Sequence, residues 1–412
     1  MRKVRLGRAV AVGGILVGIL ILSAVVFSST LNSVIISSSG TIETLPNLQL
    51  QVSGTQLLNG NNQTVYLRGV DACSFLESST GSFIATGGTY TELGTTWSNA
   101  SVVDDILDWQ SHGFNFVRIL IPCDWWLNDS AITYQGAATS IGMRDAITEF
   151  VQIAQPYGLY IEVCPWEDVG YPESGQPASG SLPYGSGEYF ANESAFVSFW
   201  AGTGTSVANV LGGYPNVLFN LYNEPDGPEA SWAEACQECI NAIRAVSQNC
   251  IVVQWGYDGY FGFPVDANLN GTNIIYDDHI YRGGSNTFTL AEYTTAELNS
   301  TLYNTYDYGE VVGHYCFMID EIGCDLGQDA YELTYYANML GLLDSWGAGY
   351  AGWVYEPGGS GYVLLQGSTF PFSLNSAGQE LVAAIQAGTT GVAFSNIGTA
   401  RMLLELHVRL VA

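Results

Sequence analysis

Short runs of apolar residues alternate along this chain with longer stretches in which apolar residues recur every three or four positions. The short runs are typical of strands buried on both faces, and the longer stretches of amphipathic helices. Strands are predicted at residues 64–72, 115–122, 159–165, 217–225, 251–257, 274–281, 316–323 and 350–357, and helices at 99–112, 142–155, 193–211, 231–246, 291–303 and 331–345. A hairpin that turns at Gly60 and Asn61 is predicted before the first strand. Eight strands separated by helices, with no antiparallel hairpin pattern in the middle, favour a single (β/α)8 TIM barrel of the α/β class over an open doubly wound sheet.

Two of the predicted strands end in acids. Residues 217–225, VLFNLYNEP, form an apolar run that ends in Glu224, and Pro225 then stops the ladder. Residues 316–323, CFMIDEIG, end in Asp320 and Glu321. The carboxyl ends of barrel strands carry active sites, and two carboxylates that face one cleft are the apparatus of glycoside hydrolysis.

The first residues of the chain predict export. Residues 1–8 carry four basic side chains and residues 9–27 are apolar, so 1–30 is interpreted as a signal peptide or a membrane anchor, with 9–27 as the tether in the second case. The protein is then secreted or held at the outer face of a membrane. Residues 31–46 form a Ser- and Thr-rich spacer, 47–388 the barrel domain, and 389–412 a C-terminal extension. The last part of this extension is expected to pack against protein, and an interfacial amphipathic segment is the alternative.

Basic residues are scarce. Among 412 residues there are 11 Lys and Arg against 39 Asp and Glu, for a net charge of −28, and Lys3 is the sole lysine. Such a chain lacks the basic clusters that bind phosphates, which excludes nucleic acid as a partner. An acidic habitat would explain the pattern, because most carboxylates would be protonated there. Compositional bias of the lineage is the alternative.

Eight cysteines in an exported chain make disulfides an expectation. Cys236 and Cys239 lie on the apolar stripe of a predicted helix, which indicates buried thiols or one bridge toward Cys250 rather than a metal or redox site. Cys123 and Cys164 end neighbouring strands, and a bridge between them is a second expectation.

Several of these motifs occur in one order: VRI on the second strand, NEP after the fourth, HxY on the sixth, EIG on the seventh and a tryptophan on the eighth. Over residues 47–388 the chain resembles glycoside hydrolase family 5, the cellulase-like retaining glycosidases. The resemblance implies an endo-acting β-glycanase without cofactor or metal, with a β-glucan as substrate and endo-β-1,4-glucanase as the activity. A β-mannanase or another β-glycanase of the family is the alternative, as is a surface glycan-binding protein that has lost turnover. A metal-dependent hydrolase lacks the His cluster that would hold the ion.

The resemblance and the chemistry together assign roles. Glu224 is expected to be the general acid/base and Glu321 the nucleophile. Asn223 is expected to bind the sugar 2-hydroxyl. Buried Arg118 is expected to pair with Glu321 and keep it ionised. Strand alternation predicts that Asp320 points away, toward the helices.

The remaining candidates follow from the same strands. Tyr281 is expected to hold Glu321, with His279 lining the glycone side. A tryptophan at the end of the eighth strand, Trp353, is expected to stack against a pyranose ring. Further subsites are predicted at the tryptophans near other strand ends, Trp125, Trp126, Trp166 and Trp255. One departure stands at Cys164, where the family usually has a histidine.

Overall fold

The computed structural model describes residues 47–72, 99–129, 131–134, 137–166, 193–225, 229–254, 269–282, 294–305, 308–327, 331–356, 361–367 and 372–388, with the short strands 35–36, 42–43 and 77–78. The chain divides into two units, one of Met1–Pro46 with Ser395–Ala412 and one of Asn47–Phe394. In the first unit, β1 (Ile35–Ile36) pairs antiparallel with β2 (Ile42–Glu43). The apolar segment 9–27, the extension 389–412 and the loop 170–188 lie outside the described residues. None of the helices in the described ranges is long and apolar enough to cross a membrane.

The second unit is built on a closed barrel of eight parallel strands, which confirms the (β/α)8 prediction. Its strands, in order around the barrel, are β5 (Arg68–Asp71), β7 (Phe116–Pro122), β10 (Tyr160–Trp166), β11 (Val217–Asn220), β12 (Ile251–Gln254), β13 (Ile274–Tyr281), β14 (Phe317–Gly323) and β15 (Gly349–Trp353). β5 closes the barrel by pairing with both β7 and β15. Glu224 therefore follows the fourth barrel strand and Glu321 lies on the seventh.

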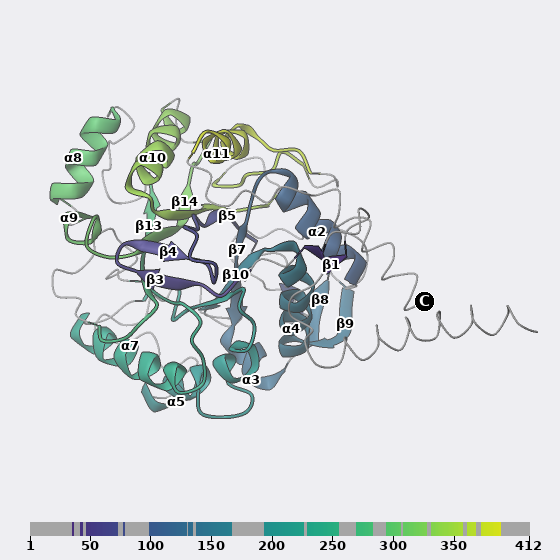
Figure 1. The fold of residues 1–412 in the computed structure, drawn as a ribbon. Helices are drawn as coiled ribbons and strands as arrows, with labels where there is room; N and C mark the ends of the chain where they lie inside the picture. Colours follow the sequence, from purple (N-terminus) through teal and green to yellow (C-terminus); the bar gives the residue numbers. More distant parts are fainter. Residues whose placement is uncertain are drawn as a thin grey trace, which may run out of the picture. The chain divides into compact units, whose positions relative to one another are not determined.

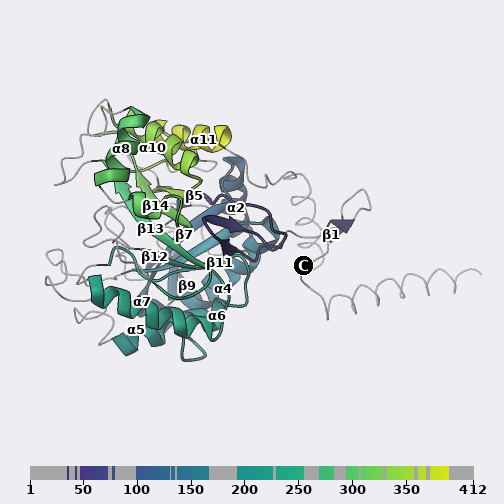
Figure 2. The same cartoon turned by 60° about the vertical axis from the view of Figure 1, so that its left-hand side comes forward.

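Helices lie outside these strands, as Figures 1 and 2 show from two directions. They are α2 (Asn99–Ser111), α3 (Cys123–Asn128), α4 (Met143–Ala154), α5 (Glu193–Trp200), α6 (Val207–Leu211), α7 (Glu229–Arg244), α8 (Thr295–Thr305), α9 (Tyr308–Val311), α10 (Glu332–Trp346) and α11 (Ser376–Ala387), with a 3₁₀ turn at Gln155–Tyr157. The single helix predicted at 193–211 is two helices. Gly202 interrupts it, because its φ of +146° is not helical.

Two small antiparallel sheets accompany the barrel in the second unit. Before the barrel, β3 (Gln51–Ser53) pairs with β4 (Gln56–Leu58), and Leu58 then bridges to Thr64 across the predicted turn at Gly60 and Asn61. The other sheet joins β6 (Glu77–Ser78), which follows the first barrel strand, to β8 (Ala131–Tyr134) and β9 (Ala137–Gly142), which follow the second. The prediction that no hairpin interrupts the alternation was wrong here, since β8 and β9 are short strands inserted between α3 and α4.

The barrel interior is layered. At the amino end of the strands the inward residues are apolar: Phe116, Tyr160, Leu218, Val252, Ile275 and Met318 belong to one buried cluster. Two positions further along each strand the residues are polar and completely or almost completely buried: Asp71, Arg118, Glu162, Asn220, Gln254, Asp277 and Asp320. Period-two alternation places these polar side chains inside the barrel as well. The site is built on this polar layer.

No disulfide joins any two of the seven described cysteines, so the predicted bridges were wrong for these residues. The pairs lie on opposite faces of the barrel wall. Cys236 and Cys239 pack in the cluster under the helices, whereas Cys250 packs in the barrel interior. Cys123 is likewise in the outer cluster and Cys164 in the inner one. The alternative prediction for Cys236 and Cys239, buried thiols, is confirmed.

Candidate active site

A β-bulge on β14 brings two adjacent acids into the barrel. Asp277 of β13 pairs with Met318, and His279 pairs with Glu321. β14 therefore advances three residues over the stretch in which β13 advances two. The same extra residue appears against β15, between Ile319 and Ile322. A bulge of this kind breaks the alternation of side chains. Asp320 therefore faces the interior beside Glu321, and the prediction that it points toward the helices was wrong.

Arg118 on β7 is the centre of the polar layer and is completely buried. Its Nη1 donates to Glu321 Oε1 at 2.6 Å, and its Nη2 donates to Asn223 Oδ1 at 2.7 Å. The Glu321 contact confirms the predicted partner. Because no surface of Arg118 is open to solvent, it does not touch substrate but fixes the two side chains that face the cleft.

The guanidinium also holds acids below the cleft. Nη1 lies 2.9 Å from Asp71 Oδ1, and Nε lies 3.0 Å from Asp320 Oδ2 and 3.2 Å from Glu162 Oε1. Asn220 joins this group by donating to Asp320 Oδ2 at 2.7 Å and to Glu162 Oε1 at 3.0 Å. A fork of donors in fixed directions thus meets carboxylates from three different strands.

Glu224 follows β11 in an unusual backbone conformation. Its φ is +45°, in the left-handed region that non-glycine residues rarely adopt. The strand ends at Asn220, earlier than predicted, and Gln254 Oε1 of β12 accepts the Glu224 backbone N–H at 2.6 Å. This contact, with Pro225 next in the chain, holds the turn that directs Glu224 into the cleft.

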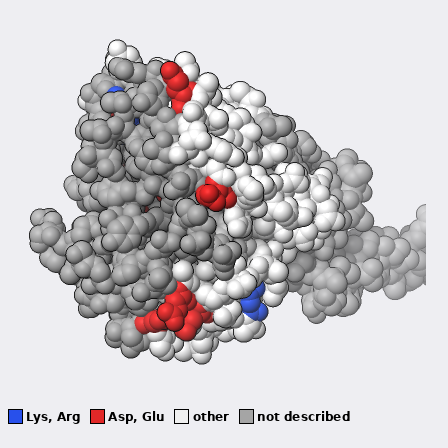
Figure 3. All heavy atoms as spheres, turned by 90° about the vertical axis from the view of Figure 1, so that its left-hand side faces the viewer, with Lys and Arg blue, Asp and Glu red and all other residues white. Residues whose placement is uncertain are grey.

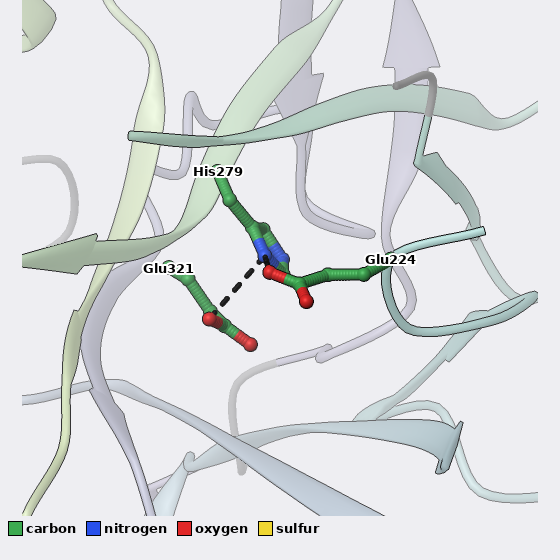
Figure 4. A group of neighbouring side chains, drawn as sticks. All are labelled: Glu224, His279 and Glu321. Atoms are coloured by element: carbon green, nitrogen blue, oxygen red, sulfur yellow. Dashed lines mark hydrogen bonds and ion pairs between the residues drawn. The ribbon is translucent and has the colours of Figure 1, made fainter. Parts of the chain in front are cut away.

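His279 lies between the two glutamates (Figure 4). Its Nδ1 is 2.9 Å from Glu224 Oε1 and 3.3 Å from Glu321 Oε2. Tyr281, two residues further on β13, donates to Glu321 Oε2 at 2.5 Å, which confirms the predicted contact. His279 is almost completely buried and binds the catalytic candidates themselves, so its position is under the pair rather than on the sugar side.

The carboxyl groups of Glu224 and Glu321 lie close together. One carboxylate oxygen of Glu224, one of Glu321 and a ring nitrogen of His279 all lie within 4.8 Å of one another. Retaining glycosidases hold their carboxyl groups about 5 to 5.5 Å apart, whereas inverting ones leave about 6.5 to 9.5 Å for a water molecule. The Glu224 side chain is 45% exposed and that of Glu321 5% exposed, so the first is open to an incoming glycoside and the second lies at the floor.

Burial and neighbouring charges shift the two pKa values in opposite directions. Burial raises the pKa of Glu321 above its ordinary value, although His279 and Arg118 act against it. The expectation that Arg118 would keep this carboxyl ionised is therefore met only in part. Burial also tends to raise the pKa of Glu224, but the hydrogen bond and charge of His279, followed by the charge of Arg118, lower it overall. These directions oppose the roles of acid and nucleophile expected for the two residues, and they describe the free protein, in which two interacting carboxyls titrate as a pair.

Sequence reasoning missed the acids of the polar layer. Burial raises the pKa values of Asp71, Glu162 and Asp277 well above the ordinary range, which favours their neutral forms. A signal was present, because each lies inside an apolar strand at the same height as Arg118. The alternation of the paired strands would have placed them beside it.

The tryptophan candidates that the structure describes lie in two different environments. Trp125 and Trp126 of α3 are 5% and 0% exposed and pack in the outer core, where Trp126 Nε1 donates to Thr205 O at 2.9 Å. They stabilise the fold, and the prediction of sugar subsites at these two was wrong. Trp353 is half-buried at the end of β15 and packs beside Leu120, Cys164, Val354 and Val363. The Trp166 side chain and Trp255 lie outside the described residues.

Cys164 occupies the place that the family pattern gives to a histidine. Its Sγ is 3.4 Å from Arg118 Nη2 and it is completely buried. Burial raises the pKa of this thiol well above its ordinary value. A neutral thiol thus covers the guanidinium at the side of the cleft.

Two trios bring donor atoms together closely enough for a metal ion: Glu224, His279 and Glu321, and Asp277, His279 and Asp320. The nearest atoms in them are 2.9 Å and 3.0 Å apart, which are hydrogen-bond distances. Arg118 already supplies a buried positive charge to these acids. Protons account for both arrangements, and we assign no metal to either.

A family model and a curated relative match the sequence of this chain. Residues 77–359 match the model of the cellulase family, glycosyl hydrolase family 5. A curated relative, Endoglucanase A of Evansella cellulosilytica, is 26% identical over 199 residues, which are 42% of this chain and 35% of the relative. The chain thus spans about a third of the length of that relative.

Solved structures have the same fold at low identity. The catalytic domain of the major endoglucanase from Xanthomonas campestris pv. campestris has a TM-score of 0.60 at 18% identity, over 82% of this chain and 99% of that one. A β-glucanase from Saccharophagus degradans in complex with cellotetraose has a TM-score of 0.58 at 15% identity, over 82% and 93%. An endocellulase from Pyrococcus horikoshii, also with cellotetraose, has a TM-score of 0.60 at 16% identity, over 82% and 98%. With a family model that matches more than half of its residues, this chain belongs to the cellulase family, glycosyl hydrolase family 5.

Proposed function

We propose that the protein is a retaining, endo-acting β-glucanase and that its substrate is a β-1,4-linked glucan. The observation that carries the proposal is the pair Glu224 and Glu321, whose carboxylate oxygens lie within 4.8 Å and share the ring of His279. Two carboxyls at that separation are the apparatus for double displacement.

In the first step the carboxyl of Glu224 gives its proton to the glycosidic oxygen while Glu321 attacks the anomeric carbon. The bond to the leaving sugar breaks and an ester to Glu321 forms, with inversion at that carbon. Tyr281 and Arg118 each hold one oxygen of Glu321, which orients the attack. Forming the ester removes the negative charge of Glu321, so the pKa of Glu224 falls and its carboxylate becomes a base.

In the second step Glu224 takes a proton from water, whose oxygen attacks the anomeric carbon and releases Glu321. The second inversion restores the configuration, and both carboxyls return to their starting states. Asn223 contributes to both steps in this proposal. Arg118 holds its Oδ1, which leaves the amide Nδ2 to donate to the sugar 2-hydroxyl.

The choice of a glucan rests on the family and on the named relatives. The relatives named above are two endoglucanases, a β-glucanase and an endocellulase, and the last two were solved with cellotetraose. Half-buried Trp353 offers a ring for stacking at the edge of the site. We also propose export of the protein, as a secreted or a membrane-tethered enzyme, from the basic residues 1–8 and the apolar segment 9–27.

The test is reducing-sugar release from β-1,4-glucan, mixed-linkage glucan, xyloglucan and mannan, with Glu224→Gln and Glu321→Gln beside the unchanged protein. Release from a glucan that falls by about 10³-fold or more in both variants is the expected result. Glu234→Gln, an exposed position on α7, is the matched control and should keep full activity. Release from mannan alone would move the substrate to another β-glycan. Binding without release from any glycan would instead identify a glycan-binding protein built on the barrel.

A further inference from the structure

One buried chain of contacts links Asp320 to Glu224 through a histidine ring. Asp320 Oδ1 lies 3.0 Å from His279 Nε2, and His279 Nδ1 lies 2.9 Å from Glu224 Oε1. Asp320 and His279 are 0% and 1% exposed. The other oxygen of Asp320 meets Arg118 Nε at 3.0 Å, so the same carboxylate also supports the arm that holds Glu321.

We propose that Asp320 is a positioning residue that keeps His279 as an imidazolium against Glu224, and thereby moves the pH range in which the enzyme works to lower pH. The inference rests on the proposed function, because it concerns the proton that Glu224 transfers.

Both nitrogens of the ring face carboxyl oxygens. Nδ1 is hydrogen-bonded to Glu224, whereas Nε2 meets Asp320 Oδ1 at an ion-pair distance without the alignment of a hydrogen bond. A neutral imidazole has one N–H and one bare nitrogen, so with Glu224 and Asp320 both ionised one carboxylate would meet a lone pair. The imidazolium places positive charge toward both carboxylates at once. Burial by itself lowers the pKa of His279, but the charge of Glu321 and the contacts with Asp320 and Glu224 raise it well above its ordinary value.

Asp320 is the group that supplies negative charge on the Nε2 side. Three charged or titratable groups face His279 on the other sides: Glu224 after β11, Glu321 on β14 and Asp277 on β13, whose Oδ2 is 3.9 Å from Nε2. Burial, and next the charge of Asp320, raise the pKa of Asp277 well above its ordinary value, which favours its neutral form. The pKa of Asp320 itself is lowered, because Arg118 and His279 outweigh its burial, so it stays ionised.

The extra residue of the β14 bulge is what creates this arrangement. Alternation from inward-facing Met318 places Asp320 inside the barrel, and the bulge lets the next residue, Glu321, face the interior as well, so that both carboxylates reach the ring. The consequence is a positive charge next to both catalytic carboxyls. That charge favours their ionised forms, so the range of pH over which the pair carries one proton lies lower than it would beside a neutral ring.

The first experiment measures the protonation state of the His279 ring directly. The chain has four histidines, so ¹⁵N-labelled imidazole signals can be assigned with His279→Gln and followed by NMR from pH 4 to pH 9. In the unchanged protein both nitrogens of His279 should remain protonated through neutral pH. In Asp320→Asn the ring should lose a proton within that range. A ring that is neutral at pH 6 in the unchanged protein would overturn the proposal, as would an imidazolium that persists in Asp320→Asn.

Asp277→Asn is the matched control, because it makes the same change 3.9 Å from the same nitrogen at a carboxyl whose raised pKa favours its neutral form. Its His279 signals should not change. Glu224→Gln covers the case in which Asp320→Asn fails to fold: if Asp320 holds the charge, His279 should stay an imidazolium after its other partner is neutralised. A neutral ring in Glu224→Gln would contradict the assignment.

The second experiment is the pH profile of kcat/KM on the glucan that the enzyme cleaves. Losing the imidazolium raises the pKa of both carboxyls, so in Asp320→Asn both limbs of the bell should move to higher pH by about one unit. A purely structural role would lower the height of the bell and leave its limbs in place. The NMR result does not depend on turnover. A protein that cleaves no glucan but shows the expected ring titration would refute the proposed function while leaving the protonation of His279 established.

Discussion

At the scale of single residues, the site depends on which groups the buried guanidinium of Arg118 contacts with each of its N–H donors. Arg118 uses Nε, Nη1 and Nη2 on groups that lie in different directions, and no carboxylate around it has a second buried arginine or lysine among the described contacts. A lysine ammonium is a point charge at the end of a flexible stem and cannot reach the same set. Charge alone therefore does not explain why an arginine stands here.

Arg118→Lys should reduce kcat by about 100-fold or more, because Glu321 and Asn223 lose their fixed partners while the positive charge remains. The melting temperature should also fall, since buried acids are left without hydrogen bonds. Initial rates on the preferred glucan and a thermal melt measure both effects. Arg144→Lys, a partly exposed pair with Asp129, is the control and should change neither. Full activity of Arg118→Lys would show that the charge suffices.

The two glutamates should respond differently to the leaving group. A dinitrophenyl glycoside leaves without protonation, so Glu224→Gln should keep most of the rate of its first step on that substrate although it loses about 10² to 10⁴-fold on the glucan. Glu321→Gln should be inactive on both, because no other group can form the ester. Release of dinitrophenol in the pre-steady state is the measurement. The reverse pattern would exchange the two roles.

At the scale of elements, the sequence predicts strands and helices from their periodicity but does not predict the register between strands. The eight strands and most helices were visible because each is a short apolar run or an amphipathic stretch with its own period. The pairing of Arg118 with Glu321 was expected because a buried guanidinium on the second strand needs a carboxylate, and the pairing of Tyr281 with Glu321 was expected from the family resemblance. The bulge on β14 was not visible, since its extra residue shows only in the register against β13 and β15. The direction of Asp320 depended on that register.

Aromatic residues near strand ends show the same limit. Composition cannot tell a tryptophan that stacks on sugar from one that closes the core. Trp126 belongs to α3, which turns back onto the outer cluster immediately after β7, and the ring is covered completely. Trp353 is the last residue of β15 and stays half-buried at the cleft. Whether the tryptophan is buried depends on the element that follows the strand, and the periodicity of the strand itself does not predict that element.

Substitution should separate the two tryptophans. Trp353→Ala should raise KM by about 10-fold with little change in melting temperature, because it removes a stacking surface worth about 1–1.5 kcal/mol. Trp126→Phe should lower the melting temperature by several degrees and leave KM unchanged, since the phenyl ring cannot donate to Thr205 O and leaves a gap in the core. KM on the preferred glucan and a thermal melt decide. An increase in KM for Trp126→Phe would restore it as a sugar subsite.

At the scale of the whole molecule, acids outnumber bases both outside and inside the barrel. Figure 3 shows one face on which the described residues are mostly uncharged, with separate acidic patches and few basic atoms. Inside, Asp71, Glu162 and Asp277 are buried around the single guanidinium of Arg118. A net charge of −28 at neutral pH adds repulsion over the whole chain. Both features cost stability when carboxyls ionise.

The sign of the pH dependence follows from the buried groups. Carboxyls whose pKa is raised in the folded state, such as Asp71, Glu162 and Asp277, stabilise the fold at low pH, and that contribution is lost as pH rises above their unfolded values. His279, whose pKa is also raised, acts in the same direction above about pH 6.5. Asp320 opposes them, but its lowered pKa means that its contribution is lost only in strong acid.

The protein should therefore melt at a higher temperature near pH 4.5 than near pH 8, by several degrees, since each kcal/mol moves the midpoint of a large domain by about 2–4 °C. Glu162→Gln should flatten this dependence, because its neutral amide keeps a carbonyl oxygen for Asn220 and has no proton to lose. Calorimetry of both proteins across that range, at fixed ionic strength, measures the slopes. A steep slope in high salt as in low salt would locate the effect in the buried acids, because surface repulsion is screened. A melting temperature that rises toward pH 8 would rule out the acidic habitat as the explanation for the missing lysines.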